Sequence, residues 1–369
     1  MKFSLDKDTF SRVLKRIDGV CNGRGSFAIL SSCMIEARDN SIIVTGTDLD
    51  ITLRVVENAH VIEEGRIAIN ARRLLDTVQN QPANVEILVA NEGSQILVSA
   101  GNFKARIPSS DINEYPKIES LSVRSSVTLD AAIFKRLINK TMFSISNDES
   151  RADFMGALLT IHENGKIQMV STDGHRLSRA EDSISITGEI NSNFNEGVII
   201  RRKGLVELDK NIEGGEISID IASNKFVVTS SSTTFYINLI AGRFPDFSKV
   251  IPSMLDHKAV IRRDDFQQIL KRASIFTNKT TGTIRLSLSH GRIDVSTYDS
   301  KSGEMNDFIE ADYEGTGVVA GFNWKYIMDI LNVIDNDYVS FEIIDMDSPA
   351  VLRDVSTQTL DFIVMPMHL

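Results

Sequence analysis

The sequence predicts an α+β protein built from three repeated domains, each with two helices packed on antiparallel sheets. Two observations predict this fold. A phenylalanine followed by two aliphatic residues and a basic residue recurs at residues 10–16, 134–140 and 266–272, in steps of 124 and 132 residues. Between these segments, short runs alternate apolar and polar residues and are bounded by glycine and asparagine, which is typical of antiparallel strands with one buried face.

Each repeat opens with a short alternating strand, at residues 1–5, 127–129 and 259–261. An acidic residue follows each strand, and we expect it to mark the start of a helix, because carboxylates stabilise the positive end of a helix. The phenylalanine spacing then places one apolar stripe against the core.

A second helical pattern follows in each repeat, at residues 72–76, 203–207 and 324–328. Prolines concentrate at the ends of the repeats, and they place the boundaries near residues 124 and 252. The predicted domains are therefore 1–124, 125–252 and 253–369.

The overall composition excludes several classes of protein. The chain has 369 residues with 42% hydrophobic and 24% charged residues. It contains no apolar run long enough to cross a membrane and no export signal at its start. Two cysteines cannot build a disulfide framework, so we expect a reducing, cytoplasmic location. The net charge of −10 argues, at first sight, against a protein that binds DNA.

The charge is unevenly distributed, however. The six predicted helical segments together carry +8, which leaves −18 for the rest of the chain. A basic helix face is commonly just solvated, but recurrence at equivalent positions favours sequence-independent contact with phosphates. The predicted DNA-facing residues on the helices are Lys15, Arg16, Arg72, Arg73, Lys140, Arg202, Lys203, Lys271, Arg272 and Lys325.

Helix geometry constrains any ring that could hold DNA. Six helices packed side by side leave a hole of about 9 Å, which is too narrow for a duplex. Twelve helices leave a hole of about 28 Å, which admits a duplex about 20 Å wide. A chain with three domains would then have to form a head-to-tail dimer.

Several short motifs carry a resemblance to a known family. They are residues 1–3, 46–50, 171–177, 202–204, 242–247 and 364–369. In this order and spacing the chain resembles the bacterial DNA sliding clamp, the β subunit of the DNA polymerase III holoenzyme, over its whole length. The resemblance implies a ring-forming homodimer that encircles duplex DNA and confers processivity, with no catalytic site of its own.

No catalytic or cofactor site is predicted. Ser171, Asp173 and His175 are too close in sequence to orient one another as a triad, and no nucleophile elbow accompanies them. The six histidines have no metal-ligand spacing, so no metal or cofactor is expected.

The resemblance instead implies an apolar pocket that receives short peptides from the polymerase, the clamp loader and repair proteins. From the residues alone, the simpler interpretation is that 363–367 form the last core strand, and the resemblance favours the pocket instead. Phe154 stands where the family commonly has a smaller aliphatic residue, and His368 replaces a frequent arginine, so motif preference can differ. The implied pocket contains Phe154, Thr172, Gly174, His175, Arg176, Leu177, Pro245, Val250, Val364, Met365, Pro366 and Met367.

For the dimer interface, the resemblance points to Ala105 and Ile107 on one side and to Ile275 and Phe276 on the other. The last two could also be ordinary core residues. Arg24 is a further candidate phosphate contact, with a solvated loop as the alternative. The competing hypothesis for the whole chain is a protein-interaction scaffold of three repeated domains that does not encircle DNA.

Overall fold

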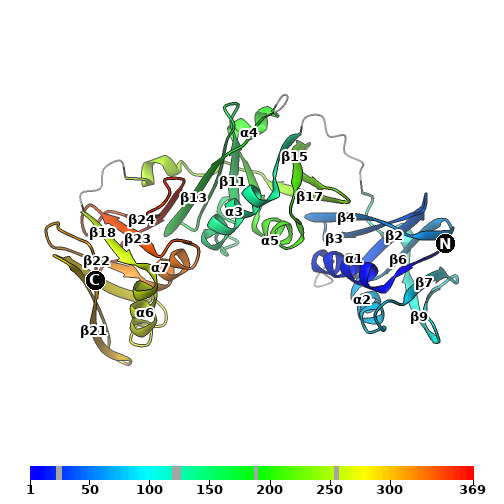
Figure 1. The fold of residues 1–369 in the computed structure, drawn as a ribbon, viewed down its shortest axis with the longest axis horizontal. Helices are drawn as coiled ribbons and strands as arrows, with labels where there is room; N and C mark the ends of the chain where they lie inside the picture. The colour runs from blue at the N-terminus through cyan, green and yellow to red at the C-terminus, as the bar shows by residue number, and fades with distance from the viewer. Residues whose placement is uncertain (22–26, 119–125, 187–189, 253–256) are drawn as a thin grey trace. The chain divides into compact units, whose positions relative to one another are not determined.

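The fold is described here from a computed structural model, in which residues 1–21, 27–118, 126–186, 190–252 and 257–369 are described. The predicted repeat is confirmed, because each repeat contains two strands that run directly into helices (Figure 1). The six pairs are β1 (Lys2–Asp6) with α1 (Lys7–Val20), β6 (Gly65–Asn70) with α2 (Ala71–Gln79), β10 (Val127–Asp130) with α3 (Ala131–Thr141), β14 (Val198–Arg201) with α5 (Arg202–Asn211), β18 (His257–Arg262) with α6 (Arg263–Ala273), and β22 (Val318–Asn323) with α7 (Trp324–Leu331).

Acidic residues cap the starts of α1 and α3, as the sequence predicts. The Asp6 carboxylate accepts the backbone N–H of Thr9 at 2.9 Å, and Asp130 accepts that of Ala132 at 2.8 Å. Both bonds satisfy amides that have no partner within the helix. The repeated phenylalanines, Phe10, Phe134 and Phe266, are fully buried. With the observed bounds, the six helices still carry +8.

The described chain groups into two compact units. The first consists of residues 1–132, 186–193 and 203–239, and the second of 133–185, 194–202 and 240–369. All strand pairs in both are antiparallel among the described residues, as the alternation predicts.

The first unit holds two sheets. One has the strand order β9 (Phe103–Ser110), β6, β2 (Ser32–Arg38), β3 (Ser41–Thr47), β4 (Ile51–Asn58), β17 (Thr233–Ile240), β16 (Lys225–Ser230), β15 (Glu216–Ala222), β10. The other has the order β5 (His60–Glu63), β1, β7 (Glu86–Asn91), β8 (Gln95–Ala100), β9.

The second unit also holds two sheets, together with the short helix α4 (Ser192–Glu196), which begins at its border. One sheet has the order β14, β11 (Gly156–Ile161), β12 (Lys166–Thr172), β13 (Arg176–Ser183), β25 (Leu360–Val364), β24 (Ala350–Asp354), β23 (Tyr338–Ile343), β18. The other has the order β21 (Gly303–Glu310), β20 (Arg292–Asp299), β19 (Thr283–Ser289), β22.

The border between the units runs through the middle repeat. One of its sheets continues into the first repeat, because β17 pairs with β4, and the other continues into the third, because β13 pairs with β25. Backbone hydrogen bonds therefore join successive repeats across both junctions.

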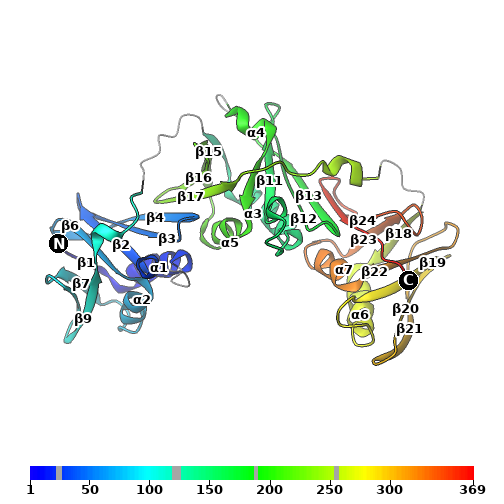
Figure 2. The ribbon, with the colours of Figure 1, turned by 180° about the vertical axis from the view of Figure 1, so that it is seen from behind.

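Helices cover one face of these sheets. In the first unit, α1 and α2 pack against each other, and α1 contacts β3 and β4 (Figures 1 and 2). The approach is close at Gly46, where an added Cβ would lie 2.9 Å from the Cys21 sulfur and 3.2 Å from the Ile17 carbonyl oxygen. Glycine at this position therefore allows the helix to lie directly on the sheet.

Candidate functional site

The histidine motif forms the turn between β12 and β13. The Thr172 hydroxyl donates to the carbonyl of Arg176 at 2.6 Å, and the Asp173 carboxylate accepts the backbone N–H groups of His175 and Arg176 at 2.9 and 3.0 Å. The hydroxyl of Ser171 bonds instead to that of Ser144, at 2.6 Å. The His175 ring is exposed and stacks on Tyr326, so Ser171, Asp173 and His175 serve a turn and have separate partners.

The same turn occurs in the first repeat, between β3 and β4. The Thr47 hydroxyl donates to the carbonyl of Ile51 at 2.9 Å, and Asp48 accepts the N–H of Ile51 at 2.7 Å. Leu49 takes a φ of 79°, where the middle repeat has Gly174 with a φ of 88°. The two motifs are therefore one structural element in successive repeats.

Each turn is tied by an ion pair to the second helix of the following repeat. In the first unit, Asp48 pairs with Lys203 on α5. In the second, Arg176 donates to Asp329 on α7 at 2.6 Å, to Asp173 at 3.0 Å and to the Phe143 carbonyl at 2.8 Å. With its side chain only 11% exposed, Arg176 is held in one position.

An apolar cavity of about 150 Å³ opens beside this turn in the second unit. Its floor belongs to the hydrophobic core, because Leu177 and Ile363 are buried there with Phe244. The lining residues are Phe154, Thr172, Gly174, Arg176, Leu177, Pro245, Asp246, Phe247, Val250, Ile363 and Met365.

The structure brings together eight of the twelve residues predicted for the pocket. His175, Val364, Pro366 and Met367 do not line the cavity. Strand alternation separates Val364 from its neighbour Ile363, since successive side chains point to opposite faces. Met367 lies elsewhere, with its backbone bonded to Gly321 and its sulfur 3.8 Å from the Thr283 hydroxyl.

Sequence reasoning missed Asp246, Phe247 and Ile363. The first two belong to the motif 242–247, from which the resemblance implies only Pro245 as a pocket residue. The Ser248 hydroxyl donates to Asp246 at 2.6 Å, and this bond holds the pKa of Asp246 below its usual range. Phe247 and Val250 form one apolar wall of the cavity, and the ionised carboxylate of Asp246 lies next to them in the lining.

Phe154, the departure from the family pattern, lies at the cavity and is fixed by a cation. The guanidinium of Arg151 lies 3.9 Å from the centre of the Phe154 ring. The same guanidinium donates to the Asp173 carbonyl at 3.2 Å. Phe154 is thereby linked to the turn at the opposite wall.

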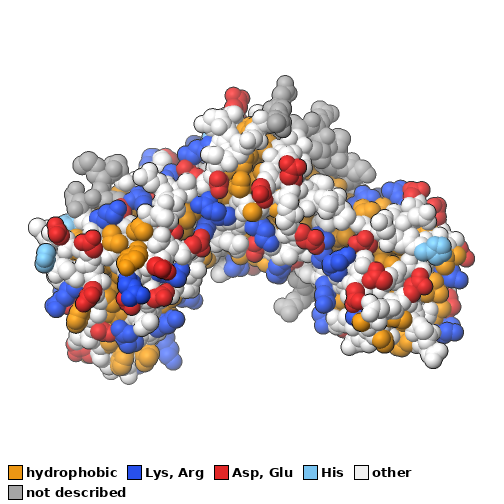
Figure 3. Space-filling view, in the orientation of Figure 1, with side chains coloured by type: hydrophobic (Ala, Val, Ile, Leu, Met, Phe, Trp, Pro, Cys, Tyr) orange, Lys and Arg blue, Asp and Glu red, His pale blue; other side chains and the backbone are white. Residues whose placement is uncertain are grey.

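A basic hollow of about 600 Å³ lies beside α1 in the first unit. Figure 3 shows lysine and arginine side chains gathered over α1 in this unit and, separately, over α6 in the other. Five cations and two carboxylates line the hollow, so anions are attracted to it. The lining residues are Lys7, Asp8, Ser11, Arg12, Lys15, Arg16, Gln79, Asn80, Lys210, Asn211 and Glu213.

Several predicted phosphate contacts on the first unit are already bound within the chain. Arg16 donates to the Thr233 hydroxyl at 2.7 Å, and burial lowers its pKa from the ordinary arginine value. Arg72 pairs with Asp18 at 3.3 Å, whereas Lys15 and Arg73 are exposed. Arg12, which the sequence pattern missed, is also exposed beside Lys15.

Lys140, on α3 in the second unit, requires a correction. Its side chain is only 7% exposed, and its ammonium pairs with Asp335 at 2.7 Å, so it offers no charge to DNA. Lys140 therefore forms a buried ion pair, although it occupies a recurring basic position. A pattern of residue types cannot distinguish such a buried lysine from one at the surface.

The remaining predicted cations of the second unit stay at the surface. Arg202, Lys271 and Lys325 are exposed. Arg272 is half exposed and pairs with Asp307 at 2.6 Å. Arg24 lies outside the described residues.

Among the sheet ends in the described residues are β9, whose residues 103–107 pair on one side only, and β21, which pairs only with β20. On β9, Ala105 is half-buried and Ile107 is 3% exposed. The Ile107 side chain packs inward in the single chain, so its place in a dimer interface stays a prediction. Beyond the end of α6, Ile275 is 70% exposed and Phe276 is half-buried, so Ile275 is no core residue.

Within the described ranges, no group of three or more histidine, cysteine, aspartate or glutamate side chains could hold a metal ion. No helix there is long and apolar enough to cross a membrane.

Comparison with known proteins places the whole chain in one family. Models of the N-terminal, central and C-terminal domains of the DNA polymerase III β subunit match residues 1–119, 128–246 and 248–368. The β sliding clamps of Salmonella typhimurium and Escherichia coli K12 are 29% and 28% identical, over 100% of this chain and of theirs.

Solved structures agree. A crystal structure of the DNA polymerase III β subunit from Pseudomonas aeruginosa is 28% identical with a TM-score of 0.95, and covers 100% of both chains. A sliding clamp from Bartonella birtlesii bound to griselimycin is 27% identical, with a TM-score of 0.94 and the same full coverage. With the basic helices, the repeated turns and the apolar cavity in place, these matches show that the chain belongs to the DNA polymerase III β subunit family, the bacterial sliding clamps.

Proposed function

We propose that this chain encircles duplex DNA as a head-to-tail dimer and tethers the replicative polymerase and repair proteins to it. The observation that carries the proposal is the separation of charge: six helices carry +8 in a chain whose net charge is −10. An acidic exterior repels a duplex from the wrong faces, while basic helices hold it once it is threaded.

The basic hollow beside α1 supports a loose hold on DNA. Lys15 and Arg12 are exposed there, and flexible cations attract phosphates without reading bases. Arg16, Lys203 and Lys140 are held in contacts within the chain, so they contribute mainly to the shape of the helix layer. A small number of weak contacts suits a protein that must move along the duplex.

The free edges of β9 and β21 support the dimer. An unpaired edge presents unbonded N–H and C=O groups that a second chain can satisfy. The edge residues are complementary in charge: β9 carries Lys104, whereas β21 carries Glu304 and Glu310. Arg106 and Asp307 also lie on these edges but pair within the chain, with Glu92 and Arg272. Phe103 and Phe308, 38% and 52% exposed, supply apolar surface to the same contact.

The apolar cavity supports the docking of short peptides from polymerase, clamp loader and repair proteins. Met365 and Phe154 offer adaptable apolar surface over a floor of core residues. A polymerase held in this way rebinds its primer end at high effective concentration instead of diffusing away. In this role the chain is an accessory subunit that catalyses no reaction and works in the cytoplasm.

The domain borders after residues 124 and 252 are part of the same proposal. The family matches end at residues 119 and 246, and the next ones begin at 128 and 248, close to these positions. The borders also separate the three pairs of strand–helix elements.

The topological claim is tested by loading the protein on nicked circular DNA with a clamp loader and then linearising the circle. We expect the protein to leave DNA with free ends and to stay on DNA whose ends are blocked. Retention on DNA with free ends would sink the proposal. A solution mass of one chain, independent of concentration, would favour the scaffold alternative.

A further inference from the structure

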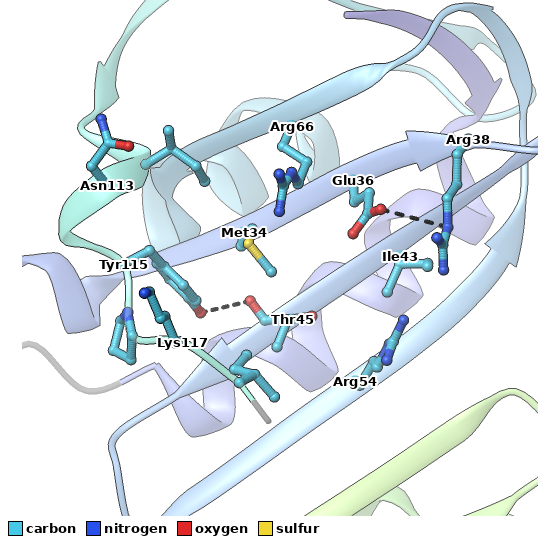
Figure 4. A pocket seen from close by; sticks show the side chains of 13 residues that line it. Met34, Glu36, Arg38, Ile43, Thr45, Arg54, Arg66, Asn113, Tyr115 and Lys117 are labelled. Carbon is cyan, nitrogen blue, oxygen red and sulfur yellow. Dashed lines mark hydrogen bonds and ion pairs between the residues drawn. The ribbon is translucent and has the colours of Figure 1, made fainter. Parts of the chain in front are cut away.

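A second, larger hollow lies on the first unit, on the sheet face opposite to the helices (Figure 4). Its volume is about 860 Å³, within the range of about 300 to 1,000 Å³ that is usual for ligand sites. It shares no residue with the apolar cavity or with the basic hollow. The lining residues are Met34, Glu36, Arg38, Ile43, Thr45, Arg54, Arg66, Ile112, Asn113, Tyr115, Pro116, Lys117 and Ile118.

Strand register places two arginines on either side of a floor that Met34, Ile43, Thr45 and Glu36 form. On this face, Thr45 lies between Met34 and Arg54, which face it from the neighbouring strands. In the next row, Glu36 lies between Ile43 and Arg66. Figure 4 shows Arg54 and Arg66 on opposite sides of Met34, pointing toward the hollow.

The far wall is anchored to the sheet by a buried tyrosine. The Tyr115 hydroxyl donates to the Thr45 carbonyl at 2.9 Å, and its side chain is only 5% exposed. Burial raises the pKa of Tyr115 above its usual range, so the hydroxyl keeps its proton and this bond. Pro116 and Lys117, which follow Tyr115 directly, are thereby held at the rim.

The hollow is strongly basic. Four cations, Arg38, Arg54, Arg66 and Lys117, accompany one carboxylate, Glu36. Glu36 pairs with Arg38 at 3.5 Å. Within the described chain, Arg54, Arg66 and Lys117 have no hydrogen bond or ion pair from their side chains, so three positive charges are left for a ligand.

We propose that this hollow binds an acidic linear segment of a partner protein, with an apolar side chain set between carboxylates. The apolar group would lie on Met34 and Ile43, and the carboxylates would pair with Arg54 and Arg66. A guanidinium binds a carboxylate through two parallel hydrogen bonds, which favours this partner chemistry.

The same geometry disfavours single-stranded nucleic acid. Proteins that bind single strands stack the bases on aromatic side chains. The only aromatic residue in the lining is Tyr115, which is buried and bonded to Thr45. Bases would have no exposed ring to stack on, whereas a peptide can use both the floor and the charges.

The proposal is tested with the full chain and a fluorescein-labelled peptide, Asp-Glu-Leu-Glu-Asp, followed by fluorescence anisotropy at low salt. We expect saturable binding that weakens with salt and is absent for the amide version, Asn-Gln-Leu-Gln-Asn. The double variant Arg54→Glu, Arg66→Glu should lose at least tenfold in affinity. Met34→Ala should lose about threefold, because the floor contributes separately from the charges.

Arg285→Glu is the matched control, since Arg285 is an exposed strand arginine outside the hollow. Its affinity for the peptide should be unchanged. No binding of the acidic peptide, or equal loss in Arg285→Glu, would overturn the proposal. Tighter binding of a ten-residue oligothymidine, lost in the double variant, would assign the hollow to nucleic acid instead. Retention of the double variant on circular DNA separates this test from the clamp function.

Discussion

Arg179 on β13 donates to Asp361 on β25 at 2.8 Å, across the strand pair that joins the middle and third repeats. Arg353 donates to the other oxygen of the same carboxylate at 2.6 Å. These contacts belong to a row of ion pairs with alternating sign that crosses six strands. In order, it contains Lys166, Glu181, Arg179, Asp361, Arg353, Glu342 and Lys258.

The centre of this row should be important for stability. Asp361 is 3% exposed at its side chain, so Asp361→Asn removes the partner that Arg179 and Arg353 share and leaves each arginine with one carboxylate, Glu181 or Glu342. We expect the free energy of unfolding to fall by about 2 kcal/mol, less than for a fully buried pair because both arginines are a quarter exposed. Urea denaturation measures it. Asp294→Asn, in an exposed pair with Arg292, should change stability by under about 0.5 kcal/mol.

Two methionines near the C-terminus differ in their relation to the apolar cavity. Met365→Ala should weaken a bound partner peptide about fivefold, because Met365 lines the cavity. Met367→Ala should leave affinity unchanged, since Met367 lies outside the lining. Isothermal titration with a peptide from the polymerase subunit measures both. Equal effects of the two changes would show that the lining is misplaced.

Exposed helix cations should set the salt dependence of DNA binding. Neutralising Lys15 and Arg73 together, by Lys15→Gln and Arg73→Gln, should reduce the slope of log affinity against log salt by about 2. Anisotropy of a labelled duplex over a salt series measures the slope. Arg66→Gln, on the opposite sheet face, is the control and should leave the slope unchanged. An unaltered slope in the helix variant would remove these residues from the DNA-facing set.

The dimer should depend on the exposed residue beyond α6. Ile275 is 70% exposed, and Ile275→Asp should yield a species of one chain, 41.0 kDa, in sedimentation experiments. Met346→Asp, at a residue that is 56% exposed in a loop, should sediment like the unaltered protein. If both variants dimerise normally, the interface lies elsewhere.

The thiol of Cys33 should be inert in the folded protein, and the half-buried thiol of Cys21 should react slowly. Burial raises the pKa of Cys21 from 9.0 to about 12, and raises that of Cys33, which is fully buried. At pH 8.5 iodoacetamide should modify Cys33 only after unfolding, as mass spectrometry would show. Because the unfolded thiol ionises first, the free energy of unfolding should fall as pH rises from about 9 toward about 12. A native protein with alkylated Cys33 would contradict this prediction.

Much of the fold could be predicted because it is encoded locally. Apolar residues three and four positions after Phe10, Phe134 and Phe266 define an apolar stripe on each helix. The helix must turn this stripe toward the core. Asp6 and Asp130 mark helix starts because their carboxylates reach amides only two or three residues ahead. These features need no knowledge of distant parts of the chain.

The candidate site was less predictable because its members meet from distant segments. Ile363 lines the cavity although it was not predicted, and Val364 was predicted but does not line it, since the face of a strand is decided by what packs on it. Lys140 looked like its counterparts on other helices, but Asp335 lies 195 residues further along the chain and captures its charge. The pattern of residue types does not reveal this contact between Lys140 and Asp335.

The sequence by itself determined the threefold repeat, the positions of the six helices and the gathering of positive charge on them. Each depends on residues close in sequence, whose periodicity and charge act over a few helical turns. Only the tertiary structure decided which cations remain exposed and which residues line the apolar cavity. It also decided that a hollow with three unpaired cations among its described lining residues lies on the sheet face opposite to the helices. Burial and ion pairing depend on neighbours brought together by the register of strands from different repeats, and register is a property of the assembled sheets.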